Sequence, residues 1–454
     1  MNKNTFFNIL FAIIVTTLTS SCIMTTASSG LAYDVWDESE TPIDSDFIID
    51  SAAKFAWLVK QTTTSGNTYT LVVNIDLDKK DLSPISGGFQ GTFRGEGHTI
   101  KNLKLFNRQN TGLFSKLVGA SPSIKAKVED LKIILGDGTL TSGIVEGAGV
   151  LAGYAENADI TGVIVSAERS AKLDITTTVG LSLHVGGIVG KSETNSTISE
   201  SSSTVNVTAT NTATTMASTF VGGITGLTTG VTIKSCSAKG NITVVSRLPF
   251  AGGIVGSVNN TTTTINLCYA TGSVTADATS GDAHAGGVVG QNSGTTSRSY
   301  SIGAVTATSA SNSAFAGGIA GKTETSSIIT SCYATGAIFA SYTTGSGSSH
   351  AGGIAGANGT GSTGNDCISI NNNITASGTN SFAGNISGSN DSPWSGNTSS
   401  FGTQIEASNT TDVINGDNFY LHGNLRQKVT TPAFGWLETD WRFRTNQDPK
   451  LYWE

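Results

Sequence analysis

A seven-residue motif built around a pair of glycines returns along the chain at nearly constant intervals. Each copy starts with Phe or His, continues with Val or Ala, the glycine pair and a branched aliphatic residue, and ends in glycine. The first glycines of the copies are 36, 30, 34, 31, 35 and 32 residues apart, at Gly186, Gly222, Gly252, Gly286, Gly317, Gly352 and Gly384, where Asn385 replaces the second glycine. Weaker copies occur at residues 149–153 and 111–115. A period of this size predicts an architecture of stacked repeats.

Each repeat also contains a stretch with an internal period of two, such as CYATGSV at residues 268–274. Matching residues on one face are Cys268, Ala270, Gly272 and Val274; Cys236, Ala238, Gly240 and Ile242; Ser299, Ser301, Gly303 and Val305; Cys332, Ala334, Gly336 and Ile338; and Ser201, Ser203, Val205 and Val207. This alternation predicts a half-buried β-strand. With the longer period it predicts an all-β fold, a right-handed parallel β-helix whose like residues stack about 4.8 Å apart.

The β-helix assigns a role to each position of the motif. Glycine allows tight corners and close approach of neighbouring coils, and the branched aliphatic residue fills the narrow interior. The leading residues form one ladder of rings: His184, Phe220, Phe250, His284, Phe315, His350 and Phe382. His284 and His350 would lie two coils apart, about 10 Å, whereas zinc needs nitrogen ligands about 2 Å from the ion. We therefore expect neither a metal site nor a cofactor.

The cysteines of the inward column pose a related question. Cys236 and Cys268 would lie on adjacent coils, at a distance that a disulfide can bridge. Ser201 and Ser299 occupy equivalent positions, so the column is interpreted as small buried side chains with free thiols. A Cys236–Cys268 bridge is the alternative.

The N-terminus has the pattern of an export signal. Lys3 precedes an apolar run at residues 6–18, and the sequence LTSSC then ends at Cys22. The stretch resembles the lipobox of bacterial lipoproteins, which implies acylation of Cys22, a membrane anchor and a place at the cell surface or outer membrane; plain secretion is the alternative. The predicted organisation is a signal peptide, a polar tether, an N-terminal cap with the first coils, the repeat β-helix and a C-terminal cap, at residues 1–22, 23–46, 47–148, 149–390 and 391–454.

Both ends of such a stack need covering, because open coil edges would pair with other chains. Residues 51–61 carry Phe55, Leu58 and Val59 at helical spacing and predict a short capping helix. Large apolar side chains crowd the end of the sequence and predict an aromatic C-terminal cap: Trp436, Trp441, Phe443, Leu451, Tyr452 and Trp453.

Charge and acid placement argue against several function classes. The net charge is −7 without a basic run, which argues against a nucleic-acid partner. The zinc peptidase signature HExxH is absent. Acids within the repeats are sparse and occupy different places in the unit: Glu193, Glu200, Asp277, Asp282, Glu324 and Asp366. A denser group, Asp76, Asp78 and Asp81 with Lys79 and Lys80, is interpreted as a solvated turn, with Asp76 and Asp78 as a calcium ligand pair the weaker alternative. We expect no catalytic residues.

The motifs AGGIVG (251–256) and CYATGSV (268–274) resemble the GLUG repeat of bacterial surface proteins and proposed adhesins, some attached to immunoglobulin A peptidases. Other segments resemble the same group: YTLVVNIDL (69–77), GGFQGTFRGEGHTIKNLKL (87–105), TGLFS (111–115) and WRFRTNQDPKLYW (441–453). The resemblance covers about residues 47–453. It implies a β-helical surface protein and brings no shared catalytic residues.

The main functional hypothesis is binding. Tyr269, Tyr300 and Tyr333 occupy outward positions on three successive coils, and an exposed aromatic row can stack on sugars or receive apolar side chains. We expect these residues to bind a glycan or a host or matrix protein; a self-stacking ladder, or a row covered by a loop, is the structural alternative. A glycan-active β-helix enzyme and a rigid surface spacer are the alternative functions.

Overall fold

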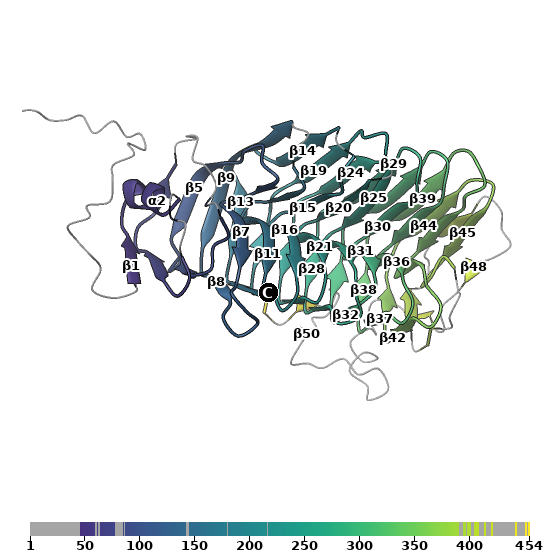
Figure 1. The fold of residues 1–454 in the computed structure, drawn as a ribbon. Coiled ribbons are helices and arrows are strands. Elements are labelled where there is room, and N and C mark those ends of the chain that lie inside the picture. The colour runs from purple at the N-terminus through teal and green to yellow at the C-terminus, as the bar shows by residue number, and fades with distance from the viewer. Residues whose placement is uncertain are drawn as a thin grey trace, which may run out of the picture.

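The computed structural model describes most of the repeat region in one continuous series of strands. The described residues are 46–59, 61, 64–77, 85, 87–141, 145–178, 180–215, 217–389, 394–395, 397–400, 404–407, 413–414, 419–420, 441–442, 450–451 and 453–454. Cys22 and residues 23–45 of the expected tether lie outside them. Parallel strands stack from one end of the molecule to the other, so the predicted parallel β-helix is confirmed (Figure 1).

One coil contains five short strands. In the coil of the FAGGIVG motif they are β25 (Leu248–Gly252), β26 (Val255–Val258), β27 (Thr264–Asn266), β28 (Tyr269–Ala270) and β29 (Val274–Ala278). The next coil repeats the series in parallel register, with Phe250 paired to His284 and Gly252 to Gly286. Each strand therefore belongs to a ladder that runs the length of the stack.

The strands that contain the first residues of the motif, including its Phe or His, form a ten-stranded ladder. Besides β25 it contains β6 (Asn110–Thr111), β10 (Gly147–Gly149), β15 (Leu183–Gly186), β20 (Ser218–Gly222), β30 (Ala283–Gly286), β35 (Ala314–Gly317), β40 (Ser349–Gly352), β45 (Ser381–Gly384) and β48 (Val413–Ile414). An eight-stranded ladder follows it around the coil. Besides β26 this ladder contains β7 (Phe114–Val118), β11 (Ala152–Glu156), β16 (Val189–Glu193), β21 (Thr225–Thr228), β31 (Val289–Asn292), β36 (Ala320–Thr323) and β41 (Ala355–Ala357).

A third, eleven-stranded ladder begins at the N-terminal end of the described chain. Besides β27 it contains β1 (Asp46–Ile49), β2 (Thr68–Leu71), β4 (Thr92–Arg94), β8 (Ala126–Glu129), β12 (Ala158–Thr161), β17 (Thr197–Ser199), β22 (Thr232–Lys234), β32 (Thr295–Ser297), β37 (Ile328–Thr330) and β42 (Thr363–Asn365).

Two further ladders share the long strand β9 (Lys132–Thr141), which pairs with both. One contains β3 (Ile75–Asp76), β5 (Thr99–Lys104), β13 (Ile164–Ala167), β18 (Ser202–Ser203), β23 (Ser237–Ala238), β28, β33 (Tyr300–Ser301), β38 (Tyr333–Ala334), β43 (Ile368–Ser369), β46 (Thr398–Ser400) and β49 (Phe419–Tyr420). The other contains β14 (Leu173–Thr177), β19 (Val207–Asn211), β24 (Ile242–Ser246), β29, β34 (Val305–Ser309), β39 (Ile338–Tyr342), β44 (Asn373–Ser377) and β47 (Gln404–Ala407).

The CYATGSV stretch therefore differs from its prediction as one strand. It forms β28 and the start of β29, which belong to different ladders and are separated by a corner at Gly272. A Cβ atom added to Gly272 would lie 2.0 Å from the carbonyl oxygen of Gly240 one coil away. The period of two survives the corner because the inward side chains on both sides of it, Cys268 and Val274, remain buried.

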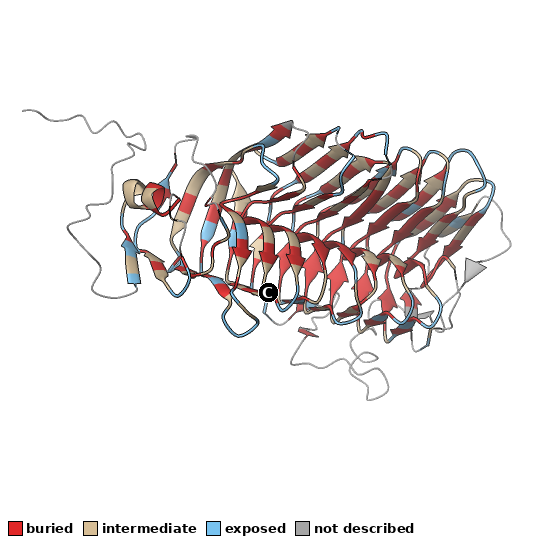
Figure 2. Ribbon diagram, viewed as in Figure 1, coloured by how far each residue is buried: buried red, intermediate tan, exposed pale blue. Residues whose placement is uncertain are grey.

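Small and branched side chains fill the interior, which is buried along the whole stack (Figure 2). The aliphatic residue of each motif copy is among them, at Ile188, Ile224, Ile254, Val288, Ile319, Ile354 and Ile386. Four buried cysteines are free thiols, as predicted: Cys236, Cys268, Cys332 and Cys367. The Cys268 thiol donates to the Asn266 carbonyl oxygen at 3.3 Å, and burial raises the pKa of the Cys236 thiol well above its ordinary value.

The glycine pairs serve both purposes expected of them, tight corners and close approach of neighbouring coils, since a Cβ on Gly253 would lie 2.1 Å from the Gly287 carbonyl oxygen one coil away. None of their glycines has a positive φ, so the freedom of glycine to adopt left-handed backbone conformations is not used there. Space decides instead: a Cβ on Gly252 would lie 1.8 Å from the Val255 carbonyl oxygen, and one on Gly186 would lie 1.9 Å from that of Val189. Only glycine allows the backbone to fold back on itself so closely.

The N-terminal end of the stack is covered as predicted. Helix α2 (Ala52–Val59) lies beside β1 at that end (Figure 1), and its apolar face buries Phe55, Leu58 and Val59. The Phe55 ring meets the Phe93 ring edge-on, with centroids 6.4 Å apart. These contacts join the helix to the core of the first coils.

The C-terminal residues lie in a different place from the one expected. Strands β50 (Trp441–Arg442) and β51 (Lys450–Leu451) pair antiparallel, and the chain end lies alongside the middle of the stack (Figure 1). Trp441 and Leu451 are buried against tyrosines of the repeat region. The described part of the C-terminus thus covers the side of the β-helix, which corrects the predicted end cap; Trp436, Phe443 and Tyr452 lie outside the described residues.

Candidate functional site

The predicted ring ladder forms along the ten-stranded ladder of strands. From His184 to Phe382 its rings stack in sequence order, with centroids 4.6 to 5.4 Å apart and planes within 17° of parallel. His284 is buried between Phe250 and Phe315. The parallel register of the motif strands therefore produces a continuous aromatic stack from an alternation of Phe and His.

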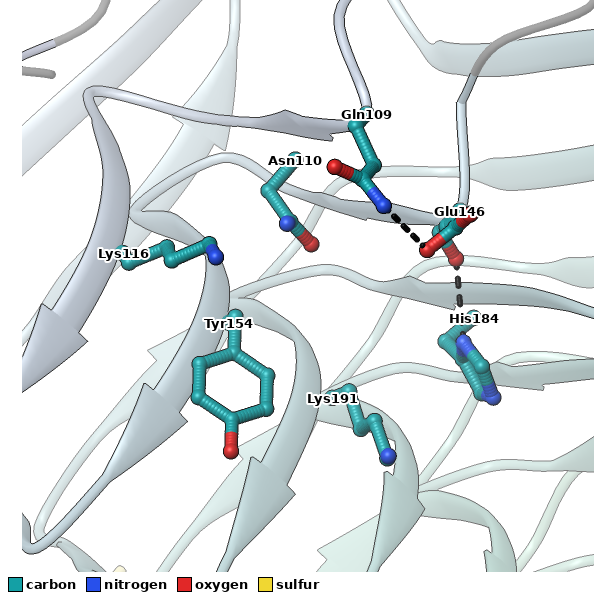
Figure 3. Close-up of a pocket in the computed structure, with 7 residues that line it drawn as sticks. All are labelled: Gln109, Asn110, Lys116, Glu146, Tyr154, His184 and Lys191. Atoms are coloured by element: carbon teal, nitrogen blue, oxygen red, sulfur yellow. Dashed lines mark hydrogen bonds between the residues drawn. The ribbon is translucent and has the colours of Figure 1, made fainter. Parts of the chain in front are cut away.

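This ladder stops at His184. The two preceding coils place Gly147 and Asn110 at the same register position, so no ring continues the stack. A polar pocket of about 210 Å³ lies there, lined by Gln109, Asn110, Lys116, Glu146, Tyr154, His184 and Lys191 (Figure 3). The pocket therefore lies beyond the end of the ring ladder, where the coils continue without a ring at this position.

Tyr154 lies between two lysines of the eight-stranded ladder. It is in register with Lys116 on one neighbouring coil and Lys191 on the other. Their ammonium nitrogens lie 5.9 and 6.0 Å from the centroid of its ring, within cation–π range. Stacking of three coils thus presents two cations and one aromatic ring to the same pocket.

Two carboxylates hold the phenol of Tyr154. Its hydroxyl donates to Glu193 Oε2 at 2.6 Å and lies 2.9 Å from Glu156 Oε2. Lys191 pairs with the other oxygen of Glu193 at 2.6 Å. Burial, followed by the hydrogen bonds to the two glutamates, raises the pKa of Tyr154 above its ordinary value. Burial raises the pKa of Glu193, but Lys191 and Tyr154 outweigh it and leave that pKa lowered.

The opposite wall holds His184 and Glu146. His184 Nδ1 lies 3.0 Å from the backbone oxygen of Glu146, so Nδ1 carries the hydrogen and Nε2 has a free lone pair. Burial lowers the pKa of His184 to about 4. The ring is therefore neutral at pH 7. The Glu146 carboxylate accepts one hydrogen bond, at 2.8 Å, from the side-chain amide of Gln109.

Several polar atoms of the pocket have no hydrogen-bond or ion-pair partner within the described part of the chain. The Asn110 side-chain amide makes no hydrogen bond, the Lys116 ammonium makes no ion pair, and His184 Nε2 accepts nothing. Figure 3 shows these groups around a common space with Tyr154. Convergent unpaired polar groups in a concave site are the usual signature of a small-molecule binding site.

The predicted tyrosine row forms, but it is not exposed. Tyr269, Tyr300 and Tyr333 stack with centroids 5.1 and 4.8 Å apart, while only 7%, 3% and 1% of their surfaces are accessible. Trp441 and Trp453 pack against the row. The expected exposure was wrong because a segment more than a hundred residues away covers the row; whether these tyrosines bind a ligand stays a prediction.

Two hydrogen bonds at the chain end hold the C-terminal residues against the tyrosine row. The Tyr300 hydroxyl donates to Glu454 Oε2 at 2.8 Å, and Trp453 Nε1 donates to the Leu267 carbonyl oxygen at 3.2 Å. Burial raises the pKa of Tyr300, so its hydroxyl keeps its hydrogen at pH 7. The covered-row alternative is thus the one that the structure displays.

The remaining acids do not assemble into one site. Glu193 belongs to the pocket network, Glu324 pairs with Lys322 at 3.1 Å, and Asp277 accepts from Thr308 at 2.8 Å. The described residues hold no group of three or more His, Cys, Asp or Glu side chains placed for a metal ion. Asp76 pairs with Lys101 at 2.8 Å, whereas Asp78, Lys79, Lys80 and Asp81 lie outside the described part.

Sequence reasoning did not find the pocket, although a signal for it was present. The weak motif copy at residues 149–153 has Gly147 where the other copies have a ring, and the copy before it has Asn110. These departures from the repeat mark the end of the ladder. Lys116, Tyr154 and Lys191 come together only through the register of three coils.

The fold and its motif define a parallel β-helix built from GLUG-type repeats. A family model for the GLUG motif matches residues 182–208, which include the HVGGIVG copy. Halomucin of Haloquadratum walsbyi is 28% identical over 191 residues, which is 38% of this chain and 2% of halomucin. The chain thus spans about 2% of the length of the curated relative it matches.

A solved structure of similar extent is a candidate immunoglobulin A1 protease from Bacteroides ovatus. The alignment covers 90% of this chain and 93% of that one, with 18% identity and a TM-score of 0.34. Separately, none of the helices in the described residues is long and apolar enough to cross a membrane.

Proposed function

We propose that this protein is a cell-surface β-helix protein of adhesin type, which binds a glycan or a host or matrix protein and catalyses no reaction. One observation carries the proposal. The pocket at the open end of the ring ladder gathers the Asn110 amide, the Lys116 ammonium and the neutral His184 ring, each with binding capacity unused in the described part of the chain. A purely mechanical spacer has no need of such a site.

Export and surface attachment are part of this proposal. The apolar run at residues 6–18 and the LTSSC sequence ending at Cys22 support a signal peptide followed by acylation of that cysteine. The similarity of the repeats to the GLUG motif and to halomucin supports a place at the cell surface. Metabolic labelling with an alkyne fatty acid should mark the wild-type chain and leave Cys22→Ser unlabelled; equal labelling would contradict the anchor.

The chemistry of the pocket favours binding over catalysis. Glu156 and Glu193 are both engaged by the Tyr154 hydroxyl, on the same network as Lys191. The raised pKa of Tyr154 makes its phenol a poor base at neutral pH. Glu156 and Glu193 are therefore too tightly paired to act as a general acid and base on opposite sides of a substrate.

The experiment that tests the proposed function is binding of the mature protein to an array of glycans and host-matrix proteins. Saturable binding to at least one of them, reproduced in solution by calorimetry, is the expected result. Binding to neither class would contradict the adhesin function and favour the spacer. Conversion of a bound glycan into a shorter or unsaturated product would contradict the absence of catalysis.

A further inference from the structure

The groups of the pocket that have unused hydrogen-bonding capacity differ in their hydrogen-bonding character. Lys116 and the amide nitrogen of Asn110 only donate, whereas His184 Nε2 and the carboxylate of Glu146 only accept. A ligand that satisfies all of them must both donate and accept within a small volume. Hydroxyl groups do both at each oxygen, since each supplies one O–H donor and two lone pairs.

Charge narrows the ligand further. Glu146 is neutralised by no cation among the described residues, and its one side-chain partner is the neutral amide of Gln109. Like charges held close together in a partly buried pocket repel each other. An anionic ligand would meet this repulsion from Glu146, and a cationic ligand would meet it from Lys116 and Lys191.

The size of the pocket sets a limit on what enters it. The pocket has a volume of about 210 Å³. This is below the range of about 300 to 1,000 Å³ typical of pockets for drug-sized ligands. The pocket therefore suits a single ring of a larger molecule.

We infer that this pocket binds one uncharged sugar residue, whose hydroxyl groups accept from Lys116 and Asn110 and donate to His184 Nε2 and Glu146. The inference rests on the proposed function and assigns that function a site and a ligand class. His184 is the discriminating residue, because it is the ring of the ladder that faces the open pocket, and its hydrogen on Nδ1 is held by the backbone of Glu146.

The ring ladder supplies a matched pair of variants. His184→Phe keeps an aromatic ring in the stack, as Phe220 and Phe250 do at the same position, but removes the acceptor from the pocket. His284→Phe makes the same chemical change where the ring is buried between two phenylalanines. Thermal unfolding of both variants checks that the stack is intact. Lys116→Met, at an exposed position, is a second test of the pocket if His184→Phe fails to fold.

The measurement is calorimetric or saturation-transfer NMR titration of the mature protein with methyl glycosides of neutral hexoses, N-acetylhexosamines and uronic acids. We expect binding of an uncharged glycoside, a loss of about tenfold or more in affinity for His184→Phe and for Lys116→Met, and unchanged affinity for His284→Phe. A tenfold loss corresponds to about 1.4 kcal/mol, as expected for one lost hydrogen bond to a polar partner.

Each of the other possible outcomes contradicts a defined part of the inference or of the proposed function. Equal affinity of wild type and His184→Phe for an uncharged glycan would remove the site while leaving the adhesin function in place. Binding of uronic acids alone would overturn the ligand class. Binding of matrix proteins but no glycan would overturn this inference and keep the proposed function, whereas no binding at all would overturn both.

Discussion

The two aromatic ladders of this molecule are covered by different parts of the chain. The Phe and His rings of the ring ladder are flanked by the next strand of their own coil. In one coil, the ammonium nitrogen of Lys322, seven residues after Phe315, lies 5.7 Å from the centroid of the Phe315 ring. The tyrosine row is covered from afar, since Tyr300 bonds to Glu454, 154 residues later. The first ladder is flanked by residues of its own coils, whereas the cover of the second depends on the end of the chain.

This difference explains which surface remains open. Phe250, His284 and Phe315 of this ladder are buried, and its other rings are half-buried. The ladder ends at the pocket beside Gly147 and Asn110. The tyrosine row has intact repeats and would be open, but the C-terminal residues close it. The open pocket thus lies where the sequence departs from its pattern, and the regular aromatic row is closed.

The largest effect on stability is expected from the substitution of a glycine in the repeated motif. Gly252→Ala places a methyl group 1.8 Å from the Val255 carbonyl oxygen, so the backbone of the coil must move. We expect a loss of more than about 4 kcal/mol in the free energy of unfolding, at the upper end for a single substitution, measured by denaturant titration.

Gly361→Asn is the matched control for that glycine. Gly361 has a φ of +70°, and a Cβ atom added to it would meet no other atom within 4 Å. Asn tolerates left-handed backbone better than most other residues. A loss below about 1 kcal/mol is expected. If the two variants lose equal stability, close approach is not what the motif glycines provide.

Two histidines of the ring ladder, His284 and His184, make its stability depend on pH. Burial, and then Lys322, lowers the pKa of His284 from 6.5 to about 3. Between these values the unfolded chain binds the proton more readily than the folded one, so stability is full above pH 6.5 and is lost as the pH falls. The loss across the whole window is about 4 kcal/mol.

The difference between wild type and His284→Phe isolates this contribution from that of the carboxylates. The wild-type free energy of unfolding should fall more steeply from pH 6.5 downward, whereas the variant lacks the titrating ring. His184→Phe should give a smaller difference, because the pKa of His184 is lowered only to about 4. Parallel pH profiles for wild type and His284→Phe would show that the ring is not held neutral.

The smallest of the three effects on stability concerns the cover of the tyrosine row. Trp441 is buried against Tyr300 and Tyr333, so Trp441→Ala should lower stability by about 3 kcal/mol and raise binding of a hydrophobic dye. Trp453→Ala removes a side chain that is 40% exposed and should have a smaller effect on both. Equal effects of the two substitutions, or no dye response, would contradict the covered row.

Much of the fold could be predicted from local patterns because each repeat makes the same contacts as its neighbours. The motif period, the inward column of Cys268 and its equivalents, the stacking of rings and the capping helix around Phe55 all follow from the alternation of side chains and the spacing of copies. The break at Gly272 was missed, since a corner that keeps the inward alternation leaves no mark in the period.

The amino-acid sequence by itself determined the stacking, because parallel register brings each residue beside its counterpart in the next repeat. Only the tertiary structure decided which surfaces are open. The pocket opens where the repeat-related positions Gly147 and Asn110 carry no ring beside His184. The cover of Tyr300 by Glu454, in contrast, depends on contacts between segments with no repeat relation to each other. Such contacts follow from the three-dimensional path of the chain, and no periodicity in the sequence records them.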